Sequence, residues 1–246
     1  MTSRFSVRFY AETGSTNDDA APLLGLPESA GLVLWADFQT TGRGRRARSW
    51  VAPPGSSLLF TTLLPRTIDA DALWAVPFWT ALGVADGIEA ATGIRVALQW
   101  PNDLLIDGRK CCGILCVSRV VGPRAWVGCG TGINVARPSG DDALEAIEPP
   151  PAFLSDRAPA VDRRVVLDAI LAAYEGLLGD LDRPHAVARA WERRAELDGT
   201  PYRIVLDGAA APFDATARRL GSDGALVVEC AGAEREVALA DARVLR

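Results

Sequence analysis

The chain has 246 residues, of which 49% are hydrophobic and 23% charged, and its formal net charge at pH 7 is −5. This composition is typical of a globular protein with a substantial core, and the length suits one large domain with a small second one. The acidic balance argues against broad binding to nucleic acid or to an anionic membrane, because both favour a basic face. The sequence shows no signal-peptide pattern and no 18-residue apolar run, so we expect a cytoplasmic protein.

Five cysteines and one histidine restrict the chemistry. The cysteine spacing matches neither a disulfide framework nor a common metal-ligand set, so we expect reduced thiols in a reducing compartment. The single histidine, His185, lies in a polar helical stretch, where a surface position is expected and a histidine-based triad is hard to build. The chemistry must therefore depend on arginine, lysine, carboxylate, amide and backbone groups, which favours electrostatic catalysis.

Hydrophobic patterning predicts six strands and two helices in the first 135 residues. Residues 15–18 offer N-cap chemistry for a short helix, Gly93 ends a buried helix, and an Asp107-Gly108 turn joins two strands. We expect strands at residues 5–10, 31–37, 56–64, 96–100, 110–117 and 125–130, and helices at 19–24 and 73–92.

The second half of the chain begins with a loop rich in proline and acidic residues, 137–160. Two amphipathic helices, 163–178 and 185–195, follow it. Beyond them, short alternating strands separated by Asp-Gly and Gly turns predict a small barrel-like β domain. These strands are expected at 202–206, 213–220, 225–230 and 234–239, and the expected domains are 1–197 and 198–246.

The most informative motif is Gly-Arg-Gly-Arg-Arg-Ala-Arg-Ser-Trp at residues 42–50. Four arginines in six positions are unusual on an acidic chain. The alternating glycines permit close backbone approach and positive φ, and guanidinium groups offer paired donors to phosphate or carboxylate. A solvated basic loop is one alternative. A nucleic-acid-binding module is another, although net acidity and the lack of aromatic residues between the arginines weigh against it.

Three further segments carry polar or glycine-rich patterns. In Gln-Trp-Pro-Asn-Asp at 99–103, proline ends a strand and exposes the Asn and Asp side chains. Lys110 begins a strand after a hairpin turn. Residues 128–135 form a glycine-rich strand-to-turn segment that does not open a Rossmann unit. Taken alone, Trp100 could be a core residue and Lys110 an exposed strand-end lysine.

In order and spacing, these segments resemble the biotin–protein ligase family over essentially the whole chain from Ser15. The resemblance implies an α+β fold, a mixed β-sheet with helices on one face similar to class II aminoacyl-tRNA synthetases and lipoate ligases, followed by a small SH3-like barrel. The matching motifs are Ser-Thr-Asn at 15–17, Gln39 before the arginine loop at 42–50, Trp-Pro-Asn-Asp at 100–103, Arg-Lys-x-x-Gly-Ile-Leu at 109–115 and Gly-x-Gly-x-Asn-Val at 130–135.

The resemblance implies a two-step reaction. The carboxylate of biotin attacks the α-phosphate of ATP in the presence of Mg²⁺, which gives biotinyl-5′-AMP and pyrophosphate. A lysine of a biotin carboxyl carrier protein domain, such as that of acetyl-CoA carboxylase, then attacks the mixed anhydride and releases AMP. Cationic donors suit the charge that develops on the phosphoryl oxygens.

The resemblance also assigns roles to the matching residues. The catalytic group comprises Arg43, Arg45 and Lys110. The biotin-binding group comprises Ser15, Thr16, Asn17, Gln39, Arg43, Gly44, Arg45, Lys110 and Gly113. The ATP- or adenylate-binding group comprises Arg43, Arg45, Arg46, Arg48, Trp50, Asn102 and Asn134. Mg²⁺ would be held mainly by the nucleotide phosphates, with Asp103 as the candidate protein ligand, and Trp100 would pack the pocket.

The chain departs from the family pattern at Gln99, at Ala47 and, as a conservative packing change, at Cys111-Cys112. Gln99 is neutral where the family commonly has lysine or arginine, so Arg95 or Arg109 would have to balance the triphosphate charge. Ala47 replaces a usual glycine, which would stiffen the loop.

Family members that repress transcription carry an additional helix-turn-helix domain before the ligase. We expect this chain to act only as a ligase, to bind neither DNA nor membranes, and to be a monomer or weak homodimer. Lipoate attachment on the same fold is the nearest alternative, but the complete arginine loop is characteristic of biotin enzymes. A non-catalytic adenylate-binding sensor is a third possibility, against which Arg43, Arg45 and Lys110 argue.

Overall fold

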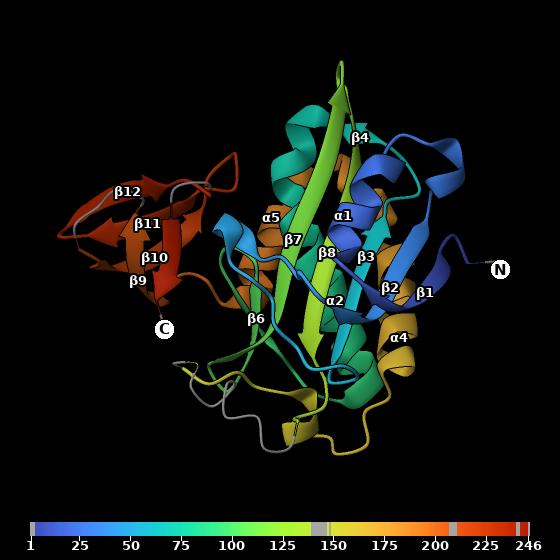
Figure 1. Cartoon of the computed structure of the whole chain (residues 1–246). Helices are drawn as coiled ribbons and strands as arrows, with labels where there is room; N and C mark the ends of the chain where they lie inside the picture. The colour runs from blue at the N-terminus through green and yellow to red at the C-terminus, as the bar shows by residue number, and fades with distance from the viewer. Residues whose placement is uncertain (1–2, 139–146, 148, 207–210, 240–241, 246) are drawn as a thin grey trace.

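The computed structural model describes residues 3–138, 147, 149–206, 211–239 and 242–245. The described chain forms a large mixed sheet with its long helices on one face, followed by a smaller antiparallel sheet (Figure 1). This arrangement confirms the predicted α+β fold class. Among the described helices, none is long and apolar enough to cross a bilayer.

The large sheet has eight strands in the order β1-β2-β3-β8-β7-β6-β5, with the short β4 paired to β8. Only β1 and β2 run parallel, and the other paired neighbours are antiparallel. The strands are β1 (Ser6–Thr13), β2 (Leu32–Gln39), β3 (Ser57–Leu63), β4 (Ile68–Asp69), β5 (Ala97–Gln99), β6 (Asp103–Ile106), β7 (Arg109–Val121) and β8 (Arg124–Asn134).

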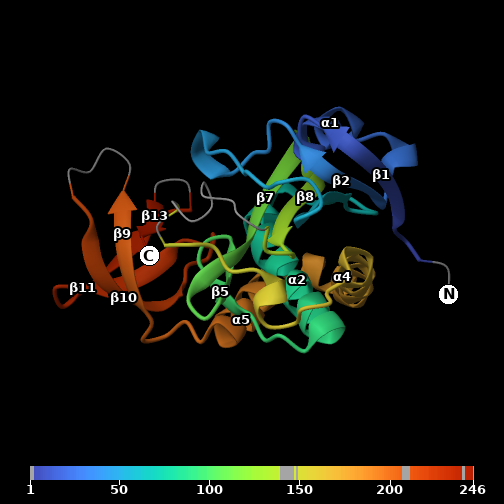
Figure 2. The same ribbon diagram turned by 60° about the horizontal axis from the view of Figure 1, so that its bottom comes forward.

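Three long helices cover one face of this sheet, while the short α1 lies on the other face (Figure 2). Turns of 3₁₀ helix connect several of these elements. The α-helices are α1 (Thr16–Ala20), α2 (Val76–Thr92), α4 (Arg163–Leu177) and α5 (Pro184–Ala195), and the 3₁₀ turns are η1 (Ala21–Leu23), η2 (Pro27–Ser29), η3 (Arg45–Ala47), η4 (Ala70–Ala75), η5 (Leu154–Asp156) and η6 (Leu178–Asp182).

Two glycines of α2 allow α4 to pack closely against it. A Cβ at Gly87 would lie 2.5 Å from the Cα of Ile170, and a Cβ at Gly83 would lie 2.4 Å from the ring of Tyr174. Tyr174 also stacks on Trp79, with the ring centroids 4.7 Å apart. This close contact builds the core behind the sheet and leaves the opposite face to α1 and to the site described below.

Helix α1 begins three residues earlier than expected. The prediction of a helix at 19–24 is wrong because Ser15, with φ −159°, is the N-cap and the next residues are already helical. Pro22 has no backbone N–H for a continuing helix, so the chain proceeds into η1 instead. The shift brings Ser15 and its neighbours to the surface of the sheet.

The predicted hairpin between 96–100 and 110–117 contains an additional strand, β6. The chain reverses after β5, and Gln99 pairs with Asp103 at the start of β6. Asp107 and Gly108, with φ 50° and 73°, then form the turn from β6 to β7. The expectation of a direct β5–β7 hairpin is therefore wrong, although the predicted turn is present.

The second sheet has the strand order β12-β11-β10-β9-β13, and its antiparallel arrangement agrees with the predicted small β unit. In the described residues, its edge strands β12 and β13 do not pair with each other, so hydrogen bonds do not close the barrel. The domain boundary expected at 197/198 falls between α5 and β9 and stays a prediction. The strands are β9 (Pro201–Leu206), β10 (Phe213–Leu220), β11 (Leu226–Cys230), β12 (Ala233–Val237) and β13 (Ala242–Leu245), the last of which was not predicted.

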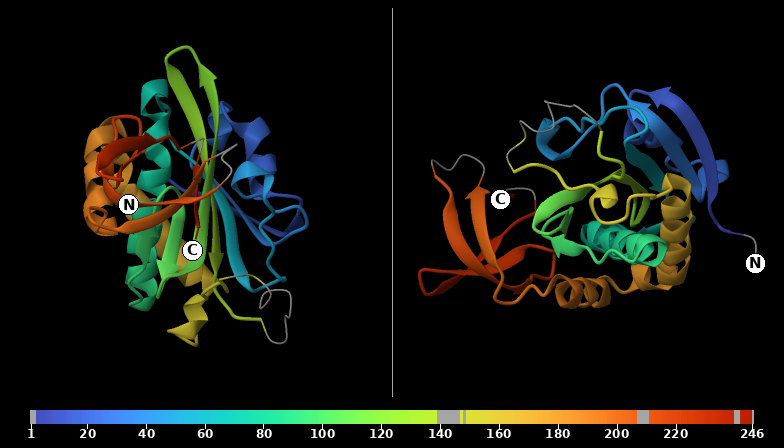
Figure 3. Two further views of the ribbon diagram at one scale, coloured as in Figure 1. Left: turned by 90° about the vertical axis from the view of Figure 1, so that its left-hand side faces the viewer. Right: turned by 90° about the horizontal axis from the view of Figure 1, so that it is seen from below.

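Trp100 joins the two sheets, which lie beside each other next to α5 (Figure 3). Its side chain is 1% exposed, and its Nε1–H donates to the carbonyl of Gly224 at 3.1 Å. Its backbone N–H donates to the hydroxyl of Tyr202 at 3.3 Å. Burial raises the pKa of Tyr202 to about 12, against a smaller opposing effect of this hydrogen bond. The junction is therefore apolar with a few paired polar groups.

Candidate functional site

A cavity of about 390 Å³ lies between α1, the loop at 42–50, the ends of β7 and β8, and the C-terminal sheet. Its wall includes every residue that the sequence analysis assigned to biotin, nucleotide or metal. These residues are Ser15, Thr16, Asn17, Gln39, Arg43, Gly44, Arg45, Arg46, Arg48, Trp50, Asn102, Asp103, Lys110, Gly113 and Asn134.

The N-terminus of α1 presents polar groups to the cavity. Ser15 occupies the N-cap position, but within this fully described helix its side chain makes no capping hydrogen bond. Thr16 donates to Oε1 of Gln39 from its backbone N–H at 2.7 Å and from its hydroxyl at 3.0 Å. These two bonds fix the Gln39 amide at the end of β2, so this end of the cavity is preorganised for a polar ligand.

Asn17 anchors α1 to the sheet. Its Nδ2 donates to the carbonyl of Leu115 at 2.9 Å, and its Oδ1 accepts from the Thr61 hydroxyl at 2.8 Å. Gly130 makes room for this side chain, since a Cβ there would lie 2.2 Å from Asn17 Oδ1. Paired buried polar groups of this kind hold a single geometry.

Two glycines form a flat floor in the cavity. Gly113 on β7 and Gly132 on β8 are register partners, and the indole of Trp50 lies over both of them. A Cβ at Gly113 would lie 2.9 Å from Trp50 Cζ3, and a Cβ at Gly132 would lie 2.8 Å from Trp50 Cε2. The interpretation of 128–135 as a strand-to-turn segment is wrong, because β8 is a regular strand up to Asn134. Its glycines instead let planar groups lie directly on the sheet.

The arginine loop at 42–50 is a tight hairpin. The N–H of Trp50 donates to the carbonyl of Gly42 at 2.9 Å, and a Cβ at Gly42 would lie 2.4 Å from the Trp50 carbonyl oxygen. The positive φ angles fall on Arg46 (59°) and Ala47 (55°), so the expectation that the alternating glycines would adopt them is wrong. Ala47 therefore holds a left-handed conformation that costs a residue with a Cβ more than it costs glycine.

Two arginines of this loop connect separate parts of the molecule. Arg43 Nε lies 2.8 Å from Asp18 Oδ2 on α1. Arg45 donates to Oδ1 of Asn102 at 3.3 Å and to the carbonyl of Leu239 in the C-terminal unit. The loop thus closes the cavity by contacts to α1, to the segment before β6, and to the residue Leu239 between β12 and β13.

Lys110 extends into the cavity from the start of β7. Its Nζ lies 2.6 Å from Oδ1 of Asp103 and 5.5 Å from the centroid of the Trp50 ring. Among the described lining residues, Asp103 is the only carboxylate. It faces five cationic side chains, namely Arg43, Arg45, Arg46, Arg48 and Lys110. The cavity is therefore a cationic site on an acidic protein, suited to anionic groups.

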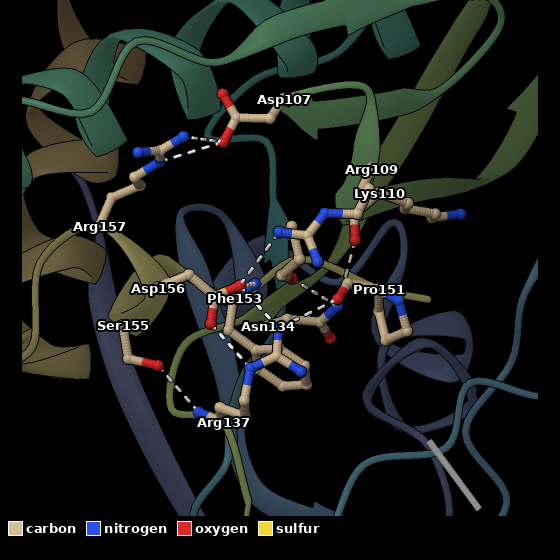
Figure 4. Close-up of polar contacts among 11 residues, drawn as sticks. Asp107, Arg109, Lys110, Asn134, Arg137, Pro151, Phe153, Ser155, Asp156 and Arg157 are labelled. Carbon is tan, nitrogen blue, oxygen red and sulfur yellow. Dashed lines mark hydrogen bonds and ion pairs between the residues drawn. The ribbon is translucent and has the colours of Figure 1, made fainter. Parts of the chain in front are cut away.

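Asn134 is fixed by the segment that contains η5. Its Nδ2 donates to the carbonyl of Ala152 at 3.2 Å, and the Ala152 N–H donates to the carbonyl of Lys110 at 2.9 Å (Figure 4). This short segment therefore binds two of the predicted site residues, Asn134 at its side chain and Lys110 at its backbone carbonyl.

The carboxylate of Asp156 holds this segment in place (Figure 4). Arg137 binds it in a bidentate manner at 2.7 and 2.8 Å, the N–H of Phe153 donates to it at 3.0 Å, and Arg109 lies 3.8 Å away. Burial opposes ionisation of Asp156, but these donors and charges outweigh it and lower the pKa of Asp156.

The two arginines proposed to compensate for the neutral Gln99 do not line the cavity in the described structure. Arg95 pairs with Glu196 at 3.3 Å on the surface. Arg109 pairs with Asp156 on the side away from Lys110 (Figure 4). The cations that do line the cavity are Lys110 and the loop arginines Arg43, Arg45, Arg46 and Arg48.

Some lining or supporting residues were not identified from the sequence. Thr61 belongs to a pair of threonines inside an otherwise apolar strand, and that polarity was a usable signal. Val244 and the Leu239 carbonyl reach the site from the C-terminal unit, and Pro149 and Pro151 from the loop before η5. No local pattern marks the residues from the C-terminal unit or from the loop before η5, because only the tertiary fold brings them to the cavity.

Comparison with known sequences gives one family. Residues 14–134 match the model of the biotin/lipoate A/B protein ligase family. A biotin–[acetyl-CoA-carboxylase] ligase of Paracoccus denitrificans is 33% identical over 225 residues, which are 89% of this chain and 92% of that protein. A protein of the same name from Mycobacterium tuberculosis is 29% identical over 96% of this chain and 88% of its own length. The bifunctional ligase/repressor BirA of Bacillus spizizenii is 31% identical over a match that covers 92% of this chain and 70% of the BirA chain.

The fold agrees with solved structures. The biotin protein ligase of Aquifex aeolicus in complex with biotin and ATP superposes with a TM-score of 0.77 at 22% identity, covering 98% of each chain. The superposition includes the C-terminal sheet, so the whole described architecture is shared.

Proposed function

The chain belongs to the biotin/lipoate A/B protein ligase family, and we propose that it is an ATP-dependent biotin–protein ligase. It activates biotin as biotinyl-5′-AMP and transfers the biotinyl group to a lysine of a biotin carboxyl carrier domain. The observation that carries this proposal is a single cavity in which a buried polar cluster, a glycine floor and five cations converge.

The polar cluster at α1 suits the bicyclic head of biotin. A ureido group carries two N–H donors and one carbonyl acceptor, so it needs both kinds of partner in a fixed arrangement. Ser15, Thr16, Asn17 and Gln39 supply hydroxyl and amide groups there, three of them held by the hydrogen bonds described above. Gly113 lets the flat ring system approach the strand.

The cationic part of the cavity suits the reacting groups. A carboxylate and a triphosphate repel each other, so their reaction needs donors that are in place before the charge develops. Arg43, Arg45 and Lys110 supply these donors, while Arg46, Arg48, Trp50, Asn102 and Asn134 form the surroundings of the nucleotide. When the carboxylate oxygen attacks the α-phosphorus, the bond from that phosphorus to the α,β-bridging oxygen breaks and pyrophosphate leaves.

In the second step the neutral amine of the target lysine attacks the acyl carbon of the mixed anhydride. The C–N bond forms, the bond from the acyl carbon to the phosphate oxygen breaks, the amine loses a proton to solvent, and AMP leaves with its charge stabilised by the same cations. The arginine loop covers the anhydride, which excludes water from a reactive bond.

The described residues fit Mg²⁺ that is bound mainly through the nucleotide. Among the lining residues, Asp103 is the only carboxylate, and the described residues contain no cluster of three metal-ligating side chains. Mg²⁺ prefers this mode, with one or two carboxylates and substrate phosphates as ligands. The ion would neutralise the triphosphate, and of the lining residues that the structure describes, Asp103 is the one able to contribute a carboxylate oxygen.

Lipoate attachment is the competing activity on this fold, and a direct experiment separates the two. The purified protein is incubated with MgATP, a carrier domain and either biotin or lipoate, and the carrier is analysed by intact mass. We expect one biotinyl group per carrier and no lipoyl group, with no labelling of a carrier whose target lysine is replaced by arginine. Preferential lipoylation would contradict the proposal.

A further inference from the structure

Residues 151–156, called the bridging segment here, run from the cavity to a cluster of charged side chains outside it (Figure 4). The regular structure described within this segment is the single 3₁₀ turn η5, yet residues 152–154 are buried and Pro151 lines the cavity. A buried segment that belongs to no sheet needs other partners for its backbone groups and other contacts to hold one geometry.

At its inner end, the bridging segment binds two residues of the site. The β7–β8 ladder ends at the pair Cys112 and Ile133, and Lys110 and Asn134 lie just beyond it. There the N–H of Ala152 donates to the Lys110 carbonyl at 2.9 Å, and the Ala152 carbonyl accepts from Asn134 Nδ2 at 3.2 Å. Because the amide nitrogen is used in this way, the amide oxygen is the acceptor that Asn134 can offer to a nucleotide.

At its outer end, the bridging segment is held by the Asp156 carboxylate. This group is 17% exposed and accepts from both Arg137 and the Phe153 N–H, with Arg109 at 3.8 Å. A single exposed ion pair would contribute little, but a largely buried carboxylate with a bidentate arginine and a backbone donor fixes its surroundings. Ser155 adds to this cluster, since its hydroxyl accepts from the Arg137 N–H at 2.9 Å.

The two ends of the bridging segment bind the same two strands. Arg109 directly precedes Lys110 on β7, and Arg137 follows Asn134 by three residues after the end of β8. Asp156 therefore links these strand ends outside the cavity, while Ala152 links them beside it. Loss of the Asp156 charge would leave two guanidinium groups without their shared partner and would release the outer half of the link.

We propose that Asp156 is a positioning residue for the nucleotide: together with Arg137 and Arg109 it holds Ala152 against the ends of β7 and β8, and Ala152 orients the Asn134 amide. The inference rests on the proposed function and extends it to a residue outside the cavity lining. The polar cluster that suits biotin lies at α1, away from this segment, so the effect should fall on ATP and spare biotin.

The test is a steady-state assay of biotinyl-5′-AMP formation, with ATP varied at saturating biotin and biotin varied at saturating ATP. Asp156→Asn keeps the shape of the side chain and removes its charge. We expect its KM for ATP to rise about tenfold, with kcat and the KM for biotin within about twofold of wild type. Arg157→Ala is the matched control, because it breaks the neighbouring exposed ion pair with Asp107 and should leave both KM values unchanged.

A double variant separates positioning from a merely structural role. Asn134→Ala should itself raise the KM for ATP, and adding Asp156→Asn to it should raise this KM little further, because Asp156 acts through Asn134. A merely structural role would lower the melting temperature and the active fraction, and so lower kcat with both KM values unchanged. Effects that multiply in the double variant would show that Asp156 acts independently of Asn134, which would overturn the proposal.

A wild-type KM for ATP in Asp156→Asn, or an equal rise in the KM for biotin, would also overturn it. Arg137→Ala provides a second variant if Asp156→Asn does not fold, and it should raise the KM for ATP in the same way. Failure of both to fold would make this cluster a determinant of folding instead. Absence of biotinyl-5′-AMP with the wild-type protein would refute the proposed function itself, and calorimetric titration of wild type and Asp156→Asn with MgATP would still test the positioning role.

Discussion

Replacement of Lys110 by alanine should abolish most adenylate formation while leaving the fold intact. The side chain is 30% exposed, so its loss removes little packing, and its main contacts are to Asp103 and the Trp50 ring. A donor aimed at developing phosphoryl charge contributes about 3–4 kcal/mol to the transition state, which corresponds to a loss of roughly 10²–10³ in rate. The substitution also takes one cationic partner away from the Asp103 carboxylate beside the phosphates, which adds repulsion in the same direction.

The assay is a rapid-quench measurement of biotinyl-5′-AMP from biotin and labelled ATP, with circular dichroism and thermal melting to verify folding. Arg157→Ala is the matched control, because it removes a cation from an exposed ion pair, with Asp107, outside the cavity. This control should form adenylate at the wild-type rate. Equal turnover of Lys110→Ala and wild type would show that Lys110 is only a surface residue and would refute the electrostatic argument.

Four further predictions follow from the structure. Arg45→Gly removes the contacts to Asn102 and the C-terminal unit, so adenylate should escape and label lysines of an added bystander protein; retention of all label on the carrier would contradict this. The backbone amides of the loop at 42–50 should gain protection from hydrogen exchange when biotin and ATP are added together, and should gain little when ATP is added alone, because the anionic adenylate attracts the arginines. Equal protection with and without ligand would indicate that the loop is a rigid turn. Duplex DNA should not bind with a steep salt dependence, since the cationic loop is a small part of an acidic surface, and sub-micromolar affinity that falls with salt would argue otherwise. Because the pKa of Tyr202 is raised in the folded protein, its contribution to stability should be complete below the unfolded pKa of about 10 and lost as the pH rises through about 12. In thermal melts, Tyr202→Phe should reduce this loss at alkaline pH, and the substitution should itself cost about 1–3 kcal/mol because the Trp100 N–H loses its acceptor.

The elements that were predicted correctly are those with a long and regular signal. The buried α2 ends at Gly93, as expected from a glycine after an apolar helical stretch. Strand β6 was missed because its four residues lie between two turn signals and look like part of one hairpin. Its partner β5 is only three residues long, so neither strand has enough residues to show an alternating pattern.

The residues of the candidate site lie in contiguous sequence motifs, and the structure brings these motifs together around one cavity. What the motifs could not show is the set of contacts between distant segments. Arg45 meets the Leu239 carbonyl across 194 positions of sequence, and Trp100 meets Gly224 across 124. The motifs also did not show that Arg109 lies outside the cavity lining in the described structure, because its side chain points away from Lys110 toward Asp156 (Figure 4).

Activation of biotin by adenylation in this cavity can be measured directly as biotin-dependent exchange of labelled pyrophosphate into ATP. The reaction needs no carrier domain and reports only the first step. With Mg²⁺ present, we expect exchange that requires biotin, is not supported by lipoate, and falls by roughly 10²–10³ in Lys110→Ala. No exchange by the folded wild-type protein, or equal exchange with lipoate in place of biotin, would contradict it.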